Sequence, residues 1–195
     1  MPPRCFVALA LPDGVVGILD AARRAVTEGA PAWSGEKWVP PGNLHVTVSF
    51  LGAVNDRELD ARVAAMQAAV ASVPSFELSL AGVAAVPSPR RAAMLWATLE
   101  DDAGSMAVLA EAIRTAFPEA GADPGKPLRP HVTLARARSH RRIGRDVLAS
   151  ASSVVSSAGK EPEGIVSVRS ATLFSSTLRP GAPEYREIAV APLSR

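Results

Sequence analysis

Apolar residues recur along this chain with two different periods, and their order predicts a protein of mixed strands and helices. Residues 4–12 form a short apolar run that is typical of a buried strand, and the spacing from Val15 to Val26 predicts a helix directly after it. A proline-rich loop is expected over 29–41, with a short extended piece at 37–40. Residues 44–52 alternate and are β-branched, which predicts a second strand.

The same succession continues further along the chain. Asn55 and Glu58 have the spacing of a capping box, and the apolar positions after them predict a helix that ends before Pro74. Two alternating runs on either side of a proline-rich turn predict a hairpin, and a helix should follow from about Asp101 to Phe117, because acidic residues favour a helix start. The remaining expected elements are a loop over 118–130, a strand over 131–138, a helix with Ile143 and Val155 in its apolar stripe, a strand over 164–176, a turn over 179–183 and a strand over 185–192.

No low-complexity tract or linker divides these elements. Residues 1–195 are therefore expected to form a single domain, in which strands and helices gather around one similar strand in each half.

Two of the three histidines stand at the head of the same tripeptide, in NLHVTVSFLG (43–52) and in RPHVTLARAR (129–138). Alternate side chains of a strand share a face, so His45 and Thr47 project together, roughly 6.5–7 Å apart, and His131 and Thr133 repeat the arrangement. If the two strands lie side by side or meet across a cleft, two imidazoles and two hydroxyls converge. These four residues are the candidate catalytic residues.

The chemistry of this set suits a phosphodiester. Imidazole has an unperturbed pKa of about 6.5, so one ring can accept a proton from a nucleophile while the other donates one to a leaving group. Threonine hydroxyls can donate hydrogen bonds to an anionic oxygen. A zinc site is disfavoured, because the chain has one cysteine and no His-x-x-x-His spacing, and no Gly-x-Ser-x-Gly elbow indicates a serine hydrolase. No metal or cofactor is expected.

Other residues have both a functional and a structural interpretation. Phe50 is expected to share the His45 face by alternation and could stack on a base, as could the three tryptophans, although aromatic residues near strands usually belong to the core. His140 is interpreted as a surface residue. The segment 126–145 contains basic and no acidic residues, which could help to hold an anion or could be a solvated basic loop.

Composition narrows the function classes. A formal net charge of +2 is too small to indicate a nucleic-acid packaging protein. The single cysteine, Cys5, excludes an internal disulfide and fits a reducing compartment. The first residues look like a signal peptide, but their apolar run is too short, and no run of 18 apolar residues occurs. We expect a soluble cytoplasmic protein.

The paired His-x-Thr strands resemble those of the 2H phosphoesterase superfamily, and their surroundings look like its RNA 2′,3′-cyclic phosphodiesterases, also called 2′-5′ RNA ligase-like proteins. The stretches that carry this resemblance are RCFVALALP, KWVPPGNLHVTVSFLG, AAMLWATL, RPHVTLARAR and LFSSTLRPGAPEYREIAVAPL. The resemblance implies an α+β fold of two pseudo-twofold-related lobes, each an antiparallel sheet with helices packed outside, and an active-site groove between the lobes.

The resemblance also implies an activity, the metal-independent hydrolysis of 2′,3′-cyclic phosphate ends on RNA or small nucleotides to 2′-phosphomonoesters. It makes Arg136 a contact for the phosphate or nucleotide and suggests His45 as the acid and His131 as the base, an assignment that the residues themselves leave open. The implied partners are RNA ends or small nucleotides, and the expected form is a monomer. Two alternatives stay open: 2′-5′ ligation or transphosphorylation, and non-catalytic capture of RNA ends.

Overall fold

The computed structural model describes residues 3–118, 129–177 and 183–195. Its strands are β1 (Arg4–Ala10), β2 (Lys37–Trp38), β3 (His45–Ala53), β4 (Phe76–Val86), β5 (Ala92–Glu100), β6 (His131–Arg141), β7 (Ile165–Val168), β8 (Ser170–Thr177) and β9 (Glu184–Pro192). Its α-helices are α1 (Asp13–Gly29), α2 (Asp56–Val70), α3 (Ser105–Ala116) and α4 (Arg145–Ala158), and its 3-10 turns are η1 (Pro31–Trp33), η2 (Pro41–Asn43) and η3 (Pro162–Gly164). Most of the expected loop over 118–130, including Lys126, and most of the turn over 179–183 lie outside the described residues.

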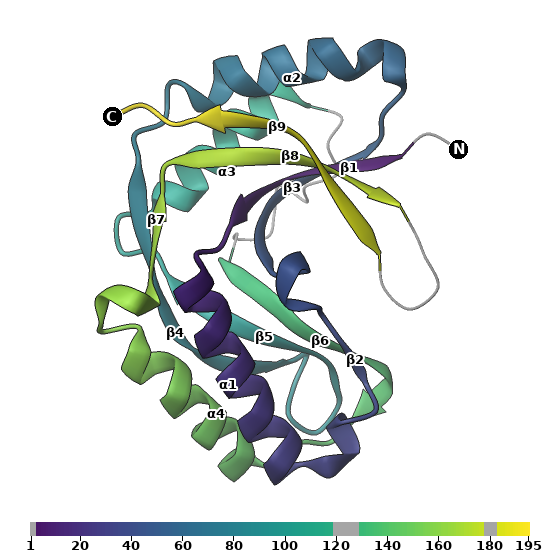
Figure 1. The fold of residues 1–195 in the computed structure, drawn as a ribbon, viewed down its shortest axis with the longest axis vertical. Coiled ribbons are helices and arrows are strands. Elements are labelled where there is room, and N and C mark those ends of the chain that lie inside the picture. The colour runs from purple at the N-terminus through teal and green to yellow at the C-terminus, as the bar shows by residue number, and fades with distance from the viewer. Residues whose placement is uncertain (1–2, 119–128, 178–182) are drawn as a thin grey trace.

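The strands of the described residues form one antiparallel sheet in the order β7-β4-β5-β6-β3-β1-β8-β9, with β2 beside β6 (Figure 1). The centre of this order is the pair β6 and β3, and three further strands follow on each side of it. We call β3, β1, β8 and β9 the first half-sheet and β6, β5, β4 and β7 the second. The two half-sheets meet where Val46 of β3 pairs with Val132 of β6. The expected α+β fold with two related lobes is confirmed.

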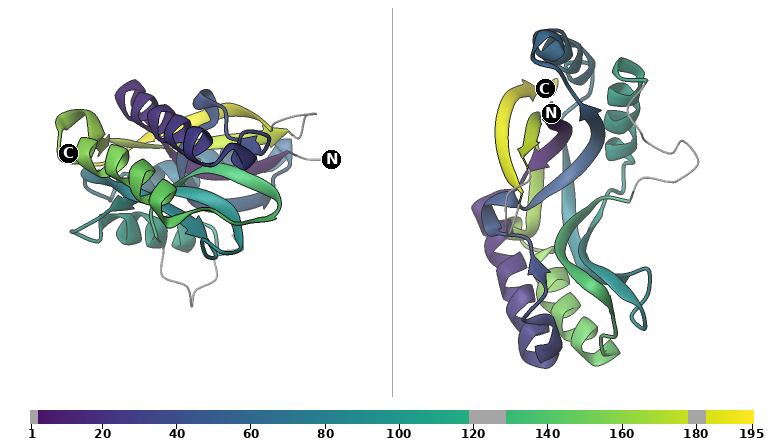
Figure 2. Two further views of the ribbon diagram at one scale, coloured as in Figure 1. Left: turned by 90° about the horizontal axis from the view of Figure 1, so that it is seen from below. Right: turned by 90° about the vertical axis from the view of Figure 1, so that its right-hand side faces the viewer.

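Each half-sheet is covered by a pair of helices on the outside of the molecule (Figures 1 and 2). Helices α2 and α3 pack against each other and against the first half-sheet, and α1 packs against α4, which covers β4 of the second. Helix α1 follows β1 of the first half-sheet, yet it lies with α4 over the second half-sheet. Helix α3 follows β5 of the second half-sheet, yet it packs against β3 of the first. The unit β1-α1-β3-α2 thus has the same arrangement as β5-α3-β6-α4.

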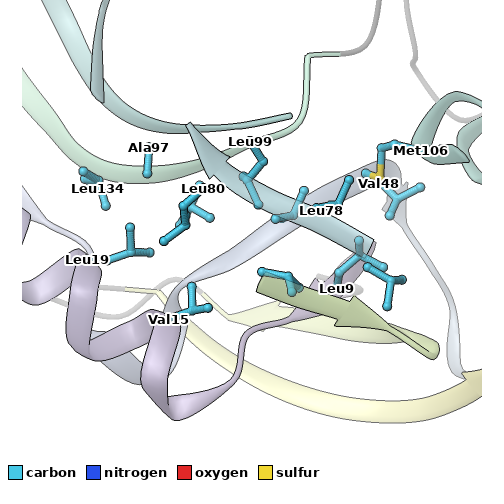
Figure 3. Close-up of a cluster of buried hydrophobic side chains, with 14 of the residues drawn as sticks. Leu9, Val15, Leu19, Val48, Leu78, Leu80, Ala97, Leu99, Met106 and Leu134 are labelled. Atoms are coloured by element: carbon cyan, nitrogen blue, oxygen red, sulfur yellow. The ribbon is translucent and has the colours of Figure 1, made fainter. Parts of the chain in front are cut away.

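The core explains which face of the central strands is free. Val46 and Val132 are fully buried, and their neighbours across the sheet, Leu9 and Ala97, are buried with them. Helix side chains such as Leu19 fill the space against this face (Figure 3). Burying an aliphatic side chain of this kind stabilises the fold by roughly 1.5–3 kcal/mol. The alternate residues of β3 and β6 must therefore point away from this core.

Most expected elements are observed near the predicted bounds, including the capping box at Asn55 and Glu58 and the buried Cys5 in the first strand. Helix α3 differs, because it begins at Ser105 rather than near Asp101. Gly104 has a positive φ of 69° and breaks the helix there. The Asp101 carboxylate instead accepts hydrogen bonds from the N–H groups of Ser105 and Met106, both at 2.9 Å, so it caps the helix from outside.

The expected strand over 164–176 is also wrong in detail. The chain forms two strands there, since β7 pairs with β4 of the second half-sheet and β8 pairs with β1 of the first. The break at Arg169 is the point where the chain crosses between the half-sheets. No helix among the described residues is long and apolar enough to cross a membrane.

Candidate active-site groove

The antiparallel pairing of Val46 with Val132 fixes the positions of both His-x-Thr units. This register sets His45 opposite Thr133 and Thr47 opposite His131. Directly opposed residues of an antiparallel pair project to the same face, with Cβ atoms about 4.5–5.5 Å apart, and diagonal neighbours lie roughly 7–8 Å apart. The structure therefore brings both imidazoles and both hydroxyls together on the face opposite the core.

Both imidazoles are oriented by the backbone in the same way. Nδ1 of His45 donates to the carbonyl oxygen of Asn43 at 2.7 Å, and Nδ1 of His131 donates to that of Arg129 at 2.8 Å. A carbonyl oxygen can only accept, so Nδ1 carries a hydrogen in both rings and Nε2 is the nitrogen left for proton transfer. Nε2 of His45 lies 3.1 Å from Oγ1 of Thr47, whose hydroxyl donates to the neutral ring.

The electrostatic surroundings favour the neutral form of both rings. Burial lowers the pKa of His45 below its usual value, and the positive charges of Arg136 and His131 lower it further against the effect of the Asn43 hydrogen bond. Burial likewise lowers the pKa of His131, with a further contribution from Arg136. Arg136 is thus electrostatically coupled to both histidines.

Two β-bulges decide what else shares this face. Phe50 and Arg136 each lie five residues after their motif histidine, so strict alternation would place both on the core side. The pairing of β3 with β1 skips Val48, and the pairing of β6 with β5 skips Leu134. Each extra residue reverses the alternation and returns the later side chain to the histidine face. Phe50 does lie on the His45 face as expected, but the expected reason, simple alternation along the strand, is wrong. The bulge at Val48 places it there.

A groove of about 450 Å³ lies over the histidine face of the sheet. Its lining includes five of the six candidate residues: His45, Thr47, Phe50, Thr133 and Arg136. The sixth, His131, is half-buried and stacks on Trp96, with the ring centroids 3.8 Å apart at an interplanar angle of 22°. Phe50 is 63% exposed, which is high for so large an apolar side chain and suits a ring that meets a ligand.

The charge of the groove is positive. Arg4, Lys37 and Arg136 line it, and none of its described lining residues is acidic. Lys37 pairs with Arg136 across β2 and β6, so two cations stand side by side at one edge. The described residues also contain no group of three or more His, Cys, Asp or Glu side chains placed to hold a metal ion. Such a lining fits an anionic ligand such as a phosphate ester.

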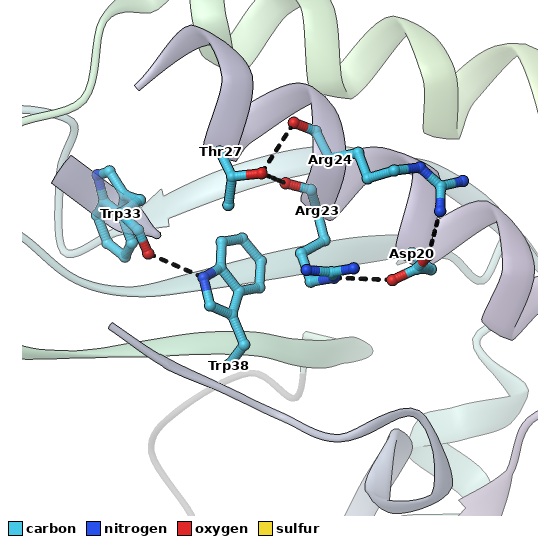
Figure 4. A network of polar contacts seen from close by, with 6 residues as sticks. All are labelled: Asp20, Arg23, Arg24, Thr27, Trp33 and Trp38. Carbon is cyan, nitrogen blue, oxygen red and sulfur yellow. Dashed lines mark hydrogen bonds and ion pairs between the residues drawn. The ribbon is translucent and has the colours of Figure 1, made fainter. Parts of the chain in front are cut away.

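The three tryptophans have three different roles. Trp33 is fully buried and belongs to the core. Trp38 lines the groove, and its indole N–H donates to the carbonyl oxygen of Trp33 at 2.9 Å, which fixes the ring (Figure 4). Trp96 lies against His131. His140 is exposed on β6, as expected of a surface residue.

Three groove residues that contact His45 were not singled out from the sequence. Tyr185, the one tyrosine of the chain, meets His45 edge-on, with centroids 5.4 Å apart and an angle of 81°. Phe6 contacts His45 from the neighbouring strand, with ring centroids 5.0 Å apart. Asn43 orients His45 through its carbonyl, and its side-chain amide donates to the carbonyl of Pro183 at 2.8 Å. The unique tyrosine was the available signal, but its contact with β3 bridges two intervening strands and follows from no local pattern.

Comparison with known proteins identifies the family. The family model of the 2′-5′ RNA ligase superfamily matches residues 11–176. The chain belongs to this superfamily. Among its relatives, a protein of Archaeoglobus fulgidus named RNA 2′,3′-cyclic phosphodiesterase is 28% identical over 187 residues, covering 96% of this chain and 98% of the relative. A protein of the same name from Methanothermobacter thermautotrophicus is 27% identical over 190 residues, covering 97% and 98% of the two chains.

Two solved structures share the fold of this chain. The protein TT0787 of Thermus thermophilus superposes with a TM-score of 0.73 at 25% identity, covering 97% of each chain. LigT of E. coli in its apo form gives a TM-score of 0.72 at 22% identity, covering 100% of this chain and 99% of LigT. The two-lobed architecture described above is therefore shared with both of these proteins over nearly the whole chain.

Proposed function

We propose that this protein hydrolyses 2′,3′-cyclic phosphate ends of RNA or nucleotides to 2′-phosphomonoesters, without a metal ion. The observation that supports the proposal is the Val46–Val132 pairing, which brings two imidazoles, one from each half of the chain, to the same face of the sheet. The names of the relatives from Archaeoglobus and Methanothermobacter support the substrate class. The positive groove supports an anionic substrate, and a structure of LigT, which shares the fold, holds 3′-AMP.

The proposed reaction uses each group once. His131, neutral at Nε2, takes a proton from a water molecule while the oxygen of that water forms a bond to the phosphorus. His45, protonated at Nε2, gives a proton to the 3′-oxygen as the bond between phosphorus and that oxygen breaks, and the 2′-ester stays intact. Hydroxyls of Thr47 and Thr133 donate to the non-bridging oxygens, whose charge grows in the transition state. Arg136 contacts the phosphate or nucleotide, and Phe50 offers a surface for a base.

The division of roles between the histidines rests on the family resemblance. The backbone contacts do not distinguish the two rings, because each has Nδ1 bound to a carbonyl and each is followed by a threonine. The lowered pKa of both rings suits the base, which must be neutral. The acid must be protonated, so it acts either in the minor fraction of enzyme molecules that carry this proton or after the negative charge of the bound phosphate has raised its pKa.

Product analysis tests the proposal. The purified protein is incubated in EDTA with 2′,3′-cyclic AMP, and the products are separated by chromatography against adenosine 2′- and 3′-phosphate standards. We expect adenosine 2′-phosphate as the product. Absence of turnover with this nucleotide and with RNA bearing a cyclic phosphate end, together with retained binding, would make the protein an RNA-end binder instead.

Ligation is the second candidate, and the superfamily name favours it. Joining a 5′-hydroxyl to a 2′,3′-cyclic phosphate would use the same two histidines with an RNA hydroxyl in place of water. Incubation of tRNA halves, one with a cyclic phosphate end and one with a 5′-hydroxyl end, followed by a search for a 2′,5′ junction, separates ligation from hydrolysis.

We further propose that residues 1–195 act as one monomeric, two-lobed domain in the cytoplasm. Each half of the chain contributes one His-x-Thr strand to the groove, so one chain holds the full set. The single free, buried cysteine fits a reducing compartment. Light scattering coupled to size-exclusion chromatography tests the monomer.

A further inference from the structure

A second hollow, of about 470 Å³, lies beyond the far end of β6, between the β4–β5 turn and the turn that leads into α4. Its lining includes three arginines, Arg90, Arg142 and Arg145, and no acidic residue. All three side chains are exposed. This hollow shares no residue with the groove that contains His45.

The two turns that carry these arginines are tied together. The N–H of Ile143 donates to the carbonyl oxygen of Pro89 at 2.9 Å, and the Ile143 side chain is only 3% exposed. The β4–β5 turn itself is closed by a hydrogen bond from the N–H of Arg91 to the carbonyl of Ser88 at 3.1 Å. Arg90 and Arg142 are therefore held near each other by the backbone and by a buried anchor, rather than by chance side-chain positions.

Three arginines outnumber the one carboxylate beside this hollow, that of Asp146. The neighbouring Arg141 is paired with the buried carboxylate of Glu36. Within the described part of the chain, by contrast, Arg90, Arg142 and Arg145 have no ion-pair partner, and the carboxylate of Asp146, beside Gly144, is the acid nearest in sequence. Gathering like charges opposes folding, so an external anion would stabilise this arrangement.

Strand β6 connects this hollow with the groove. It begins with His131 and Thr133, carries Arg136 at the groove edge, and ends just before Arg142. The two ends of β6, His131 and Arg141, pair with Thr98 and Ala92 of β5, so they lie roughly 20 Å apart at the usual rise of a strand. Figure 1 shows β6 running from the centre of the sheet to the end of the second half-sheet. A mononucleotide in the groove cannot reach that far, whereas an RNA strand of several nucleotides can.

We propose that Arg90, Arg142 and Arg145 form a subsite for the phosphodiester backbone of the RNA strand that ends in the cyclic phosphate, several nucleotides upstream of that end. Guanidinium groups bind phosphate oxygens through paired, charge-assisted hydrogen bonds. The identity of the bound end rests on the proposed function. The substrate class is thereby narrowed to oligonucleotide RNA in preference to free cyclic mononucleotides.

Equilibrium binding and turnover test the two proposals separately. Binding of a fluorescein-labelled RNA of about twelve nucleotides with a 3′-phosphate is followed by anisotropy between about 50 and 200 mM salt. The triple variant R90A/R142A/R145A should bind about tenfold more weakly. Its plot of log affinity against log salt should be shallower by about 0.7 for each phosphate that the variant no longer neutralises. Turnover of 2′,3′-cyclic AMP should change by less than about twofold, because the hollow lies far from the histidines.

Two control variants fix the interpretation. R57A/R169A/R195A removes the same charge from other surfaces and should leave the salt slope of the wild type. R90K/R142K/R145K keeps the charge and should retain most of the slope. Thermal unfolding of each variant, followed by circular dichroism, verifies that the fold is intact.

Each outcome decides between the proposals. Equal RNA affinity and salt slope in the wild type and R90A/R142A/R145A, or an equal loss in R57A/R169A/R195A, would overturn the subsite. Arginine-dependent binding of a polyglutamate peptide, with none of RNA, would make this surface a protein-docking site and the RNA proposal wrong. If the wild type hydrolyses no cyclic phosphate but its RNA binding depends on the three arginines, the proposed function fails and the subsite stands.

Discussion

Val46 and Val132 lie directly opposite each other, both fully buried, at the pair of strands where the two half-sheets meet. Because the motif histidine precedes each valine and the motif threonine follows it, the position of this one pair sets the distance between the two imidazoles. The core holds the pair from one side and leaves the other side to the groove. The site is therefore as rigid as the packing beneath these two residues.

Removal of either motif histidine should abolish most turnover. H45A and H131A are each expected to lower kcat/KM for 2′,3′-cyclic AMP by about 10² to 10⁴, since each loses one proton-transfer group. H140A, on the exposed part of β6, is the matched control and should be unaffected. With a 4-nitrophenyl phosphodiester, which needs no acid, H45A should lose much less activity than H131A. The reverse order would exchange their roles, and full activity of either variant would contradict the mechanism.

The threonine hydroxyls should matter more than the threonine shape. T47V and T133V keep a β-branched side chain in the strand and remove one donor, so kcat should fall by about 10² to 10³. T47S and T133S retain the hydroxyl and should keep most of the activity. In T47V the loss also includes the hydroxyl that donates to Nε2 of His45. Wild-type kcat in both valine variants would show that the hydroxyls do not contact the reacting phosphate.

The pH dependence follows from the lowered pKa of both histidines. The base works only above its pKa and the acid only below its own, and both values lie under the usual value of about 6.5. The kcat/KM profile for 2′,3′-cyclic AMP should therefore peak below about pH 6.5 and fall as the pH rises further.

Arg136 provides the test of this explanation. Its positive charge lowers the pKa of both rings, so R136Q should move the whole profile to higher pH, apart from its effect on the absolute rate. R138Q, on the same strand, is the control and should leave the profile in place. NMR titration of the imidazole C–H resonances measures the same shift without substrate. An unchanged titration in R136Q would rule out this coupling.

The ring of Tyr185 should position His45 through its edge-on contact. Aromatic pairs of this kind contribute about 0.5–1.5 kcal/mol, so Y185L should lower kcat/KM by about two- to tenfold. Y185F keeps the ring and should match the wild type, and His45 chemical shifts should move in Y185L only. An equal loss in both variants would assign the effect to the hydroxyl rather than to the ring.

The grouping of each motif histidine with its threonine on one face was within reach of the sequence, because it depends on strand period and on a repeated motif. Alternation predicts that His45 and Thr47 share a face, and the repeat at His131 and Thr133 predicts a second unit of the same kind. The sequence could not show that the two strands pair at Val46, because strand order is set by long-range packing. The capping box at Asn55 was equally local and equally predictable.

The remaining features depend on contacts that no local pattern reports. The bulges at Val48 and Leu134 are defined by what β1 and β5 skip, so the faces of Phe50 and Arg136 could not be derived by counting. Two strands, β8 and β1, separate β9 from β3 in the sheet, so the contact of Tyr185 with His45 depends on the course of the sheet in space and on the reach of the side chains. The break at Arg169 depends on the two half-sheets that the chain must join.

The exchange of α1 and α3 between the half-sheets has a consequence for how this chain can be divided. A cut in the β4–β5 turn would divide both half-sheets, since β4 belongs to the second and β8 and β9 to the first, and it would also separate each from a helix that covers it and expose apolar surface. Neither fragment could hold its own histidine in place, but two complementary fragments could enclose each other and restore the groove. The two repeated units of the sequence are therefore not independent modules, because each needs contacts with the other to fold.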